Sequence, residues 1–157
     1  SFNMAITTFV GQNIGAKKYD RVKKGVFAAW LMSSGVILVC SVCMFLSAPF
    51  LISVFTKDAD VIAIGSDMVR IFASLYIALP VVQILNGALR GAGLSKIPMY
   101  FMLGSFVVLR QIYLMIAVPL TDSVNVVMAG WPLTWVICAV GMAWYYFKTD
   151  WLKRNDV

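Results

Sequence analysis

Four long stretches of nearly uncharged sequence constrain the fold more than any other feature. Residues 26–56, 71–89 and 123–147 carry no charged side chain, and residues 97–121 carry one, Arg110. About 20 apolar residues in a helix cross the hydrocarbon core of a bilayer. Backbone in lipid must satisfy its own hydrogen bonds, and closed β-barrels are built from short alternating strands instead. The sequence therefore predicts an all-α, polytopic membrane helical bundle.

Composition excludes a soluble globular domain of this length. The chain has 157 residues, of which 61% are hydrophobic and 13% are charged. Soluble domains carry roughly a quarter of charged residues. A short chain buries too small a share of its surface to hide so much apolar area from water. The bilayer is therefore the expected surroundings.

The apolar stretches and the polar segments between them set the expected boundaries. We expect the end of a helix over 1–11, a loop over 12–25, helices over about 26–55, 61–90, 97–120 and 123–147, and a tail over 148–157. Residues 1–11 are apolar but too short to cross a bilayer. They are interpreted as the inner end of a helix whose outer half is missing, so the chain is expected to be a fragment.

Basic residues alternate along the chain in a way that sets orientation. Lys and Arg number five, one, two, none and three in the five successive polar segments. The positive-inside rule puts the rich segments in the cytoplasm. The sequence thus predicts a multi-pass protein of the cytoplasmic membrane with its C-terminus inside. Anionic lipid on that face accounts for the net charge of +6, so no nucleic-acid partner is expected.

The sequence gives no support to catalysis or metal binding. It contains no His and no Glu, and its three cysteines (Cys40, Cys43, Cys138) lie inside apolar runs, where they are interpreted as small buried hydrophobic residues. Neither a Ser/His or Cys/His pairing nor paired acids are present inside a span. We therefore expect no enzyme, no metal site and no cofactor.

The helix over 61–90 is the most informative for function. Pro80 lies near its centre and cannot pair with the carbonyl of Tyr76, so a bend is expected there with a free acceptor. One face carries a polar stripe: Tyr76, Pro80, Gln83, Gly87 and Arg90, with Asn86 beside it. A polar stripe beside a kink fits a wet substrate cavity lined by Tyr76, Gln83 and Asn86. The alternative is that Gln83 and Asn86 bond a neighbouring helix.

Two further charged positions lie within or beside the spans. An arginine deep in a helix is costly in lipid, so Arg110 is expected to face the cavity or to snorkel outward. Asp67 and Arg70, one turn apart, are expected to form a local pair at the outer side.

Glycines mark two helix ends that precede basic segments. Gly11–Gly15 and Gly87–Gly91 have the small-xxx-small spacing that permits close helix packing. Gly91 and Gly93 can each end a helix with a left-handed residue.

Three segments resemble one family in the order in which the family has them. TTFVGQNIGAKKYDRVKKG, LISVFTKDADVIAIGSDMVRI and LNGALRGAGLSKIPM, within residues 7–99, are similar to helix ends and turns of multidrug and toxic compound extrusion transporters. The resemblance implies two six-helix bundles. Residues 1–157 would then be the end of helix eight and helices nine to twelve, a partner of the missing N-terminal bundle.

The resemblance also implies an activity. Family members export small cationic amphipathic compounds in exchange for H⁺ or Na⁺ by alternating access. Some carry an acid in the tenth helix, whereas the corresponding stretch, Tyr76 to Gly87, has none. The coupling ion would then bind in the missing N-terminal half. Two alternatives stay open: a lipid-linked oligosaccharide flippase of similar architecture, and a non-transporting structural membrane protein.

Overall fold

The structure is a computed structural model that describes residues 2–120 and 124–152, apart from the side chain of Asn125. The described residues fold into helices with no strand: α1 (Phe2–Gly15), α2 (Tyr19–Ser53), α3 (Ala59–Leu75), α4 (Ala78–Gly91), α5 (Lys96–Met102), the π-helix η1 (Leu103–Leu109), α6 (Arg110–Leu120) and α7 (Val124–Lys148). The predicted all-α class is confirmed. Asp122, Lys153 and Arg154, which entered the charge count, lie outside the described residues.

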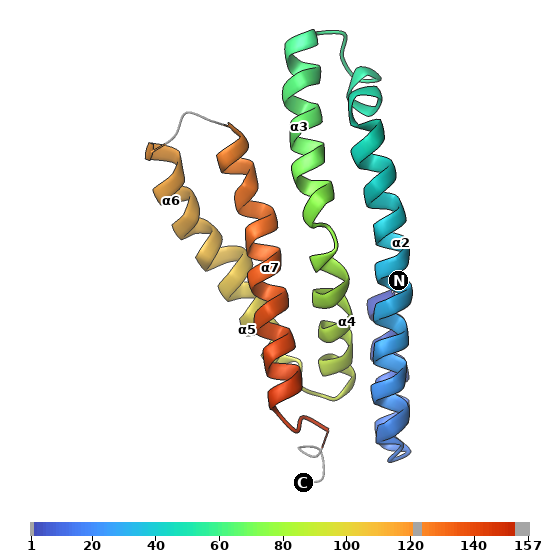
Figure 1. Ribbon diagram of the computed structural model, residues 1–157. Coiled ribbons are helices and arrows are strands. Elements are labelled where there is room, and N and C mark those ends of the chain that lie inside the picture. The colour runs from blue at the N-terminus through green and yellow to red at the C-terminus, as the bar shows by residue number, and fades with distance from the viewer. Residues whose placement is uncertain (1, 121–123, 153–157) are drawn as a thin grey trace.

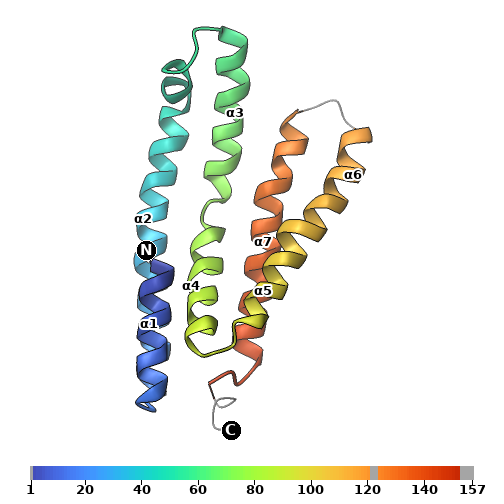
Figure 2. The ribbon, with the colours of Figure 1, turned by 180° about the vertical axis from the view of Figure 1, so that it is seen from behind.

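The helices run roughly along one axis, with the segment α5–η1–α6 leaning away from the rest (Figure 1). Figure 2 shows α1 beside α2 and α4, at the end of the molecule where α4 turns into α5. By length and composition, three helices suffice to cross a membrane: Tyr19–Ser53, Lys96–Leu120 and Val126–Lys148. A fourth span is obtained when the bent pair α3–α4 is counted as one. The protein is therefore a multi-pass membrane protein.

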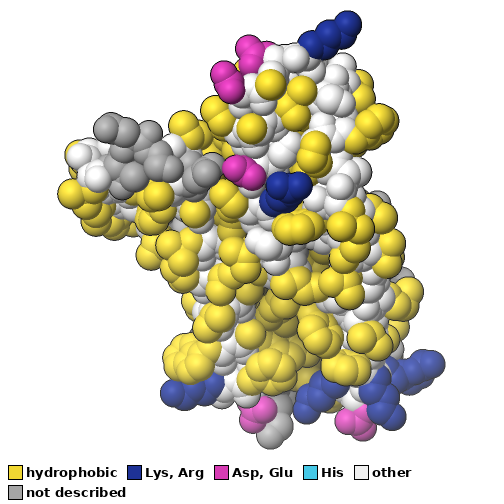
Figure 3. All heavy atoms as spheres, turned by 45° about the horizontal axis from the view of Figure 1, so that its top comes forward, with side chains coloured by type: hydrophobic (Ala, Val, Ile, Leu, Met, Phe, Trp, Pro, Cys, Tyr) yellow, Lys and Arg dark blue, Asp and Glu magenta, His cyan; other side chains and the backbone are white. Residues whose placement is uncertain are grey.

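Two ends of the bundle carry most of the charge. The end that holds the α1–α2 turn, the α4–α5 turn and the last turn of α7 is called the basic end, from Lys17, Lys18, Arg90, Lys96 and Lys148. The opposite end holds Asp58, which precedes α3, and Asp60 in the first turn of α3. Between the charged ends, the face in Figure 3 is largely hydrophobic, interrupted by one adjacent acidic and basic side chain. This is the surface expected of a bundle in lipid.

The expected loop over residues 12–25 is wrong. α1 continues to Gly15 and α2 begins at Tyr19, so the two helices are joined by a tight turn. The amide of Lys18 donates to the carbonyl of Asn13 at 2.8 Å, and that of Lys17 donates to Ile14 at 2.8 Å. With Lys17 at a φ of 54°, this is a Schellman ending. Lysines and arginines are good helix formers, so the charge of this stretch did not mark a loop.

The helix expected over 61–90 is broken rather than bent at Pro80. α3 ends at Leu75, α4 begins at Ala78, and the two are inclined by 49°. Pro80 lies in the first turn of α4, where a missing N–H leaves no helical bond unmade. The carbonyl of Tyr76 accepts from the amide of Leu79 at 3.0 Å, so the predicted free acceptor at Tyr76 is wrong.

The break is held by a contact from another helix. The hydroxyl of Ser41, in the middle of α2, donates to the carbonyl of Ala73 in the last turn of α3. This carbonyl is one of those that a helix end leaves without a regular partner. The amide of Tyr76 also lies 3.4 Å from it. α2 therefore stabilises the broken form of the α3–α4 span.

The span expected over 97–120 is continuous but irregular. It begins with α5, passes through the π-helix η1 and ends with α6. π-helical turns within α-helices are rare, and those that occur are often found at functional sites. Of these residues, Ser105 of η1 is buried, whereas Val107 and Val108 are exposed on the outside of the bundle.

The core lies around α4. Buried side chains of α4 include Val82, Ile84, Leu85, Ala88 and Leu89, and they pack with residues of α1, α2 and α7. α4 is thus enclosed on several sides, while much of α2 is exposed. The surroundings of each candidate residue on α4 therefore depend on its neighbours α1, α2 and α7.

Candidate functional site

α1 and α4 pack parallel to each other near the basic end. Contacts join residues that are 80 apart in the chain: Asn3 with Gln83 and Thr7 with Gly87. The Thr7 hydroxyl lies 2.8 Å from the Asn3 carbonyl and 3.1 Å from the Gly87 carbonyl, and it shares its proton between them. We call this contact surface the α1–α4 seam.

The glycines predicted to permit close packing divide into two groups. A Cβ added at Gly87 would lie 2.3 Å from Ile6, and one at Gly91 would lie 2.4 Å from the Thr7 carbonyl. A Cβ added at Gly11 would be in ordinary contact, 3.4 Å from the Gly91 carbonyl oxygen. A Cβ at Gly15 would meet nothing within 4 Å, so Gly15 has no packing role among the described residues.

Gly93, not Gly91, ends α4 with a left-handed residue. Its φ is +77°. The amide of Leu94 donates to the Leu89 carbonyl at 2.9 Å and that of Gly93 donates to Arg90 at 3.0 Å, which is again the Schellman pattern. The prediction of a left-handed helix end is therefore confirmed at Gly93 and wrong at Gly91.

Gln83 lies at the seam. The Asn3 amide nitrogen donates to the Gln83 backbone carbonyl at 2.7 Å and to its side-chain Oε1 at 3.3 Å. The side chain of Gln83 is exposed in this chain. The structure thus shows the alternative for Gln83, in which its side chain bonds to a neighbouring helix, here α1.

Asn86, three residues after Gln83 on α4, points toward α5. Its amide nitrogen donates to the Met102 sulfur at 3.0 Å, and the residue is 8% exposed. Its Oδ1 is buried and has no hydrogen-bond partner in the described chain. Asn86 lines a pocket of about 490 Å³ with Arg90, Ser95 and side chains of α5 and η1. A buried acceptor without a donor costs about 1–3 kcal/mol, so a water or ligand donor is the expected partner.

The remaining two candidates pack on tryptophans of α7. The rings of Tyr76 and Trp135 have centroids 5.5 Å apart, and the guanidinium carbon of Arg110 lies 3.1 Å from the centroid of Trp131. A guanidinium over an indole face is a favourable cation–π contact. Arg110 is therefore paired within the bundle by an aromatic ring, a partner that was not predicted.

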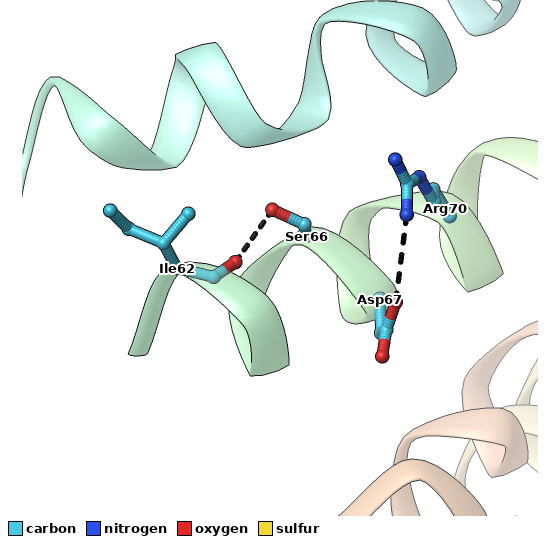
Figure 4. Close-up of polar contacts among 4 residues, drawn as sticks. All are labelled: Ile62, Ser66, Asp67 and Arg70. Atoms are coloured by element: carbon cyan, nitrogen blue, oxygen red, sulfur yellow. Dashed lines mark hydrogen bonds and ion pairs between the residues drawn. The ribbon is translucent and has the colours of Figure 1, made fainter. Parts of the chain in front are cut away.

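Asp67 and Arg70 form the predicted local pair. Arg70 Nη1 lies 3.7 Å from Asp67 Oδ1 on the surface of α3, and Ser66 bonds back to the Ile62 carbonyl at 2.6 Å (Figure 4). Both charged side chains are well exposed, which makes the pair worth little by itself.

The structure thus separates the four cavity candidates into three environments. Gln83 lies at the seam, Asn86 lines the pocket between α4 and α5, and Tyr76 and Arg110 pack on α7. The break after Leu75 separates Tyr76 from the rest of the predicted stripe, whereas Pro80, Gln83, Gly87 and Arg90 all lie on α4. Sequence reasoning missed Asn3, Ser41 and Met102, whose roles depend on which helices are neighbours.

The described residues contain no group of three or more His, Cys or Asp side chains that could hold a metal. Cys138 is buried as predicted, but Cys40 and Cys43 are exposed on α2. Their prediction as buried residues is wrong, because apolar sequence in a membrane helix can face lipid as easily as protein.

The geometry defines a polytopic helical membrane protein with a broken span and a glycine-packed helix pair. Comparison with known proteins makes this specific: the family model described as MatE matches residues 1–116, so the chain belongs to the MatE family. The family consists of transporters rather than enzymes. The resemblance found in the sequence motifs is confirmed.

Two relatives are named "Probable multidrug resistance protein NorM". That of Thermotoga maritima is 32% identical over 97 residues, which are 62% of this chain and 21% of the relative. That of Pasteurella multocida is 31% identical over 104 residues, which are 66% of this chain and 22% of the relative. The match thus spans about a fifth of the length of either relative.

Proposed function

We propose that this chain is the C-terminal part of a secondary active exporter of small cationic amphipathic compounds in the cytoplasmic membrane. The observation that carries the proposal is the MatE match over residues 1–116. The multidrug resistance names of the two relatives support the substrate class. Helices from an N-terminal bundle, outside residues 1–157, would complete the transporter.

The proposed exchange ion is H⁺ or Na⁺. A coupling carboxylate has to lie at membrane depth, where low dielectric moves its pKa into a useful range. The described Asp residues are Asp20, Asp58, Asp60, Asp67 and Asp150, which lie at the two ends of the bundle or on the exposed surface of α3. This supports a coupling site in the N-terminal bundle. The Lys and Arg distribution supports a cytoplasmic basic end and C-terminus.

Alternating access requires an element with two arrangements. The 49° break between α3 and α4 is the place where this chain departs most from a straight span. Hinges are commonly residues at element ends that absorb changes in backbone angles. We propose that α4 and its partner α1 tilt as a unit about Tyr76 and Ile77.

Asn86 is the substrate-cavity residue that the geometry supports best. Its buried Oδ1 is an acceptor without a donor, at the wall of a pocket that also contains Met99 and Phe106. An ammonium N–H of a cationic substrate would supply the donor. Met and aromatic walls adapt to varied apolar groups. Tyr76, Gln83 and Arg110 would then act by holding helices rather than by touching substrate.

The test uses the full-length protein that contains this chain, expressed in a host that lacks its own exporters. Efflux of a cationic dye such as ethidium is followed in everted vesicles under an imposed pH or Na⁺ gradient. We expect gradient-dependent transport that falls several-fold in Asn86→Ala. Gln111→Ala, an exposed amide on α6, is the matched control. Gradient-independent fluxes, or equal fluxes in Asn86→Ala and wild type at equal expression, would contradict the proposal.

A further inference from the structure

A second cavity lies at the basic end and contains none of the residues discussed as substrate candidates. Its volume is about 620 Å³, and it lies between α2, α4, α7 and the residues that follow α7. Its lining includes Lys23, Phe27, Trp30, Ile84, Tyr146 and Trp151. Small-molecule sites usually measure 300–1,000 Å³, so the cavity can hold a molecule of that size.

The walls of this cavity suit the apolar part of an amphipathic molecule. Lys23, Phe27 and Trp30 follow helical spacings of four and three on one face of α2. Across from them, α4 contributes Ile84, which is 1% exposed. A chain-like apolar group entering along α2 would therefore contact hydrophobic side chains on both sides and a cation at one end.

Aromatic side chains place the cavity at the level of the membrane interface. Trp151 is 3% exposed and packs on Tyr146 with ring centroids 5.0 Å apart, just beyond the end of α7. Residues 149–152 thus line the cavity at the end of α7. Trp and Tyr are enriched where the hydrocarbon core meets the headgroups. A lipid would have its phosphate at this depth.

The charged side chains at the basic end determine whether an anionic or a cationic occupant is favoured. The described residues at the basic end carry eight basic side chains and two acidic ones: Lys17, Lys18, Arg21, Lys23, Lys24, Arg90, Lys96 and Lys148 against Asp20 and Asp150. Lys23 lines the cavity from α2 and Asp150 lines it from beyond α7. An anionic group is therefore favoured on the α2 side. Basic pockets between membrane helices are known to hold anionic lipid headgroups.

We propose that this cavity binds one anionic glycerophospholipid, with its phosphate at Lys23 and the start of an acyl chain between Trp30 and Ile84. The lipid would fill the space between α2, α4 and α7 and link their ends. Since the site shares no residue with the pocket at Asn86, it does not depend on the proposed transport function.

The experiment is native mass spectrometry of the purified full-length protein in detergent, titrated with palmitoyl-oleoyl phosphatidylglycerol or with the matching phosphatidylcholine. We expect the phosphatidylglycerol to bind at least fivefold more tightly. Lys23→Gln should weaken its binding about fivefold, the factor that one lysine beside an anionic lipid surface contributes. Lys24→Gln removes the same charge from the next residue, which does not line the cavity, and should change binding less than twofold.

A second variant tests the cavity itself. Ala143→Leu adds apolar volume to the α7 wall without changing charge, and it should lower phosphatidylglycerol binding at least threefold while the protein remains folded by circular dichroism. Equal losses in Lys23→Gln and Lys24→Gln would overturn the proposal in favour of general charge attraction. Equal affinity for both lipids, unchanged binding in Ala143→Leu, or the absence of bound lipid would overturn it as well.

Discussion

Replacing Gly91 by alanine should weaken the α1–α4 seam. The added Cβ would lie 2.9 Å from Val10 and 2.4 Å from the Thr7 carbonyl oxygen. The second distance is about 1 Å short of the 3.4 Å at which ordinary contact begins. The obstacle at Thr7 is backbone, so no rotamer change can relieve it. α1 must move away from α4 by about that distance, and the Thr7–Gly87 hydrogen bond at 3.1 Å must stretch.

The magnitude follows from three terms. Overpacking of this kind costs about 1–3 kcal/mol, and loss of an interhelical hydrogen bond in a membrane costs about 0.6 kcal/mol. Alanine regains up to about 1 kcal/mol of helix propensity relative to glycine. We therefore expect Gly91→Ala to lower the free energy of unfolding by about 1–2 kcal/mol.

The assay is unfolding of the full-length protein by SDS in mixed micelles, followed by circular dichroism. The matched control is Gly35→Ala, since a Cβ at Gly35 in the middle of α2 meets nothing within 4 Å. The control should gain stability or leave it unchanged. Equal stability of Gly91→Ala and Gly35→Ala would contradict the close approach of α1 and α4 at Gly91.

The remaining predictions concern the break between α3 and α4, the contact of Arg110 with Trp131, and the turn after α1. Ser41→Ala removes the donor to the Ala73 carbonyl and should lower stability by about 0.5–1.5 kcal/mol in the same SDS titration, whereas Ser41→Thr should restore part of it. Arg110→Met and Trp131→Leu should show a coupling of about 0.5–2 kcal/mol in a double-mutant cycle, and additive losses would contradict the cation–π contact. Lys17→Gly relieves the strain of the left-handed backbone at residue 17 and should raise the free energy of unfolding by about 1 kcal/mol. A lower free energy of unfolding would contradict the turn geometry.

The class of fold could be predicted because hydropathy acts on each helix separately. The uncharged runs required membrane helices whatever their neighbours, and α7 over Val124–Lys148 was expected to within a residue at each end. The close packing at Gly87 and Gly91 was also predictable, since the spacing of small residues is a property of one helix. Family membership followed from local motifs at helix ends.

Features that depend on pairs of helices could not be predicted in the same way. The broken span is stabilised by Ser41, which is 32 residues away in the chain from Ala73. The partner of Arg110 is a ring on α7, and nothing in the sequence around Arg110 marks it. Asn86 was predicted as a cavity residue from its place beside a stripe, but its orphan acceptor is visible only after α5 is placed beside α4.

The packing of α1 on α4 has a consequence for how the two helices can be aligned. Both end in the same motif, Gly-xxx-Gly-Ala, at Gly11–Ala16 and Gly87–Ala92, which is an offset of 76 residues. The observed pairs are offset by 80, which sets Thr7 opposite Gly87 and Gly11 opposite Gly91. A shift of α1 by one helical turn, about 6 Å, would instead set both glycines of one motif opposite both glycines of the other. In the shifted register Asn3 would lie opposite Leu79, so the hydrogen bonds from Asn3 to Gln83 favour the observed alignment.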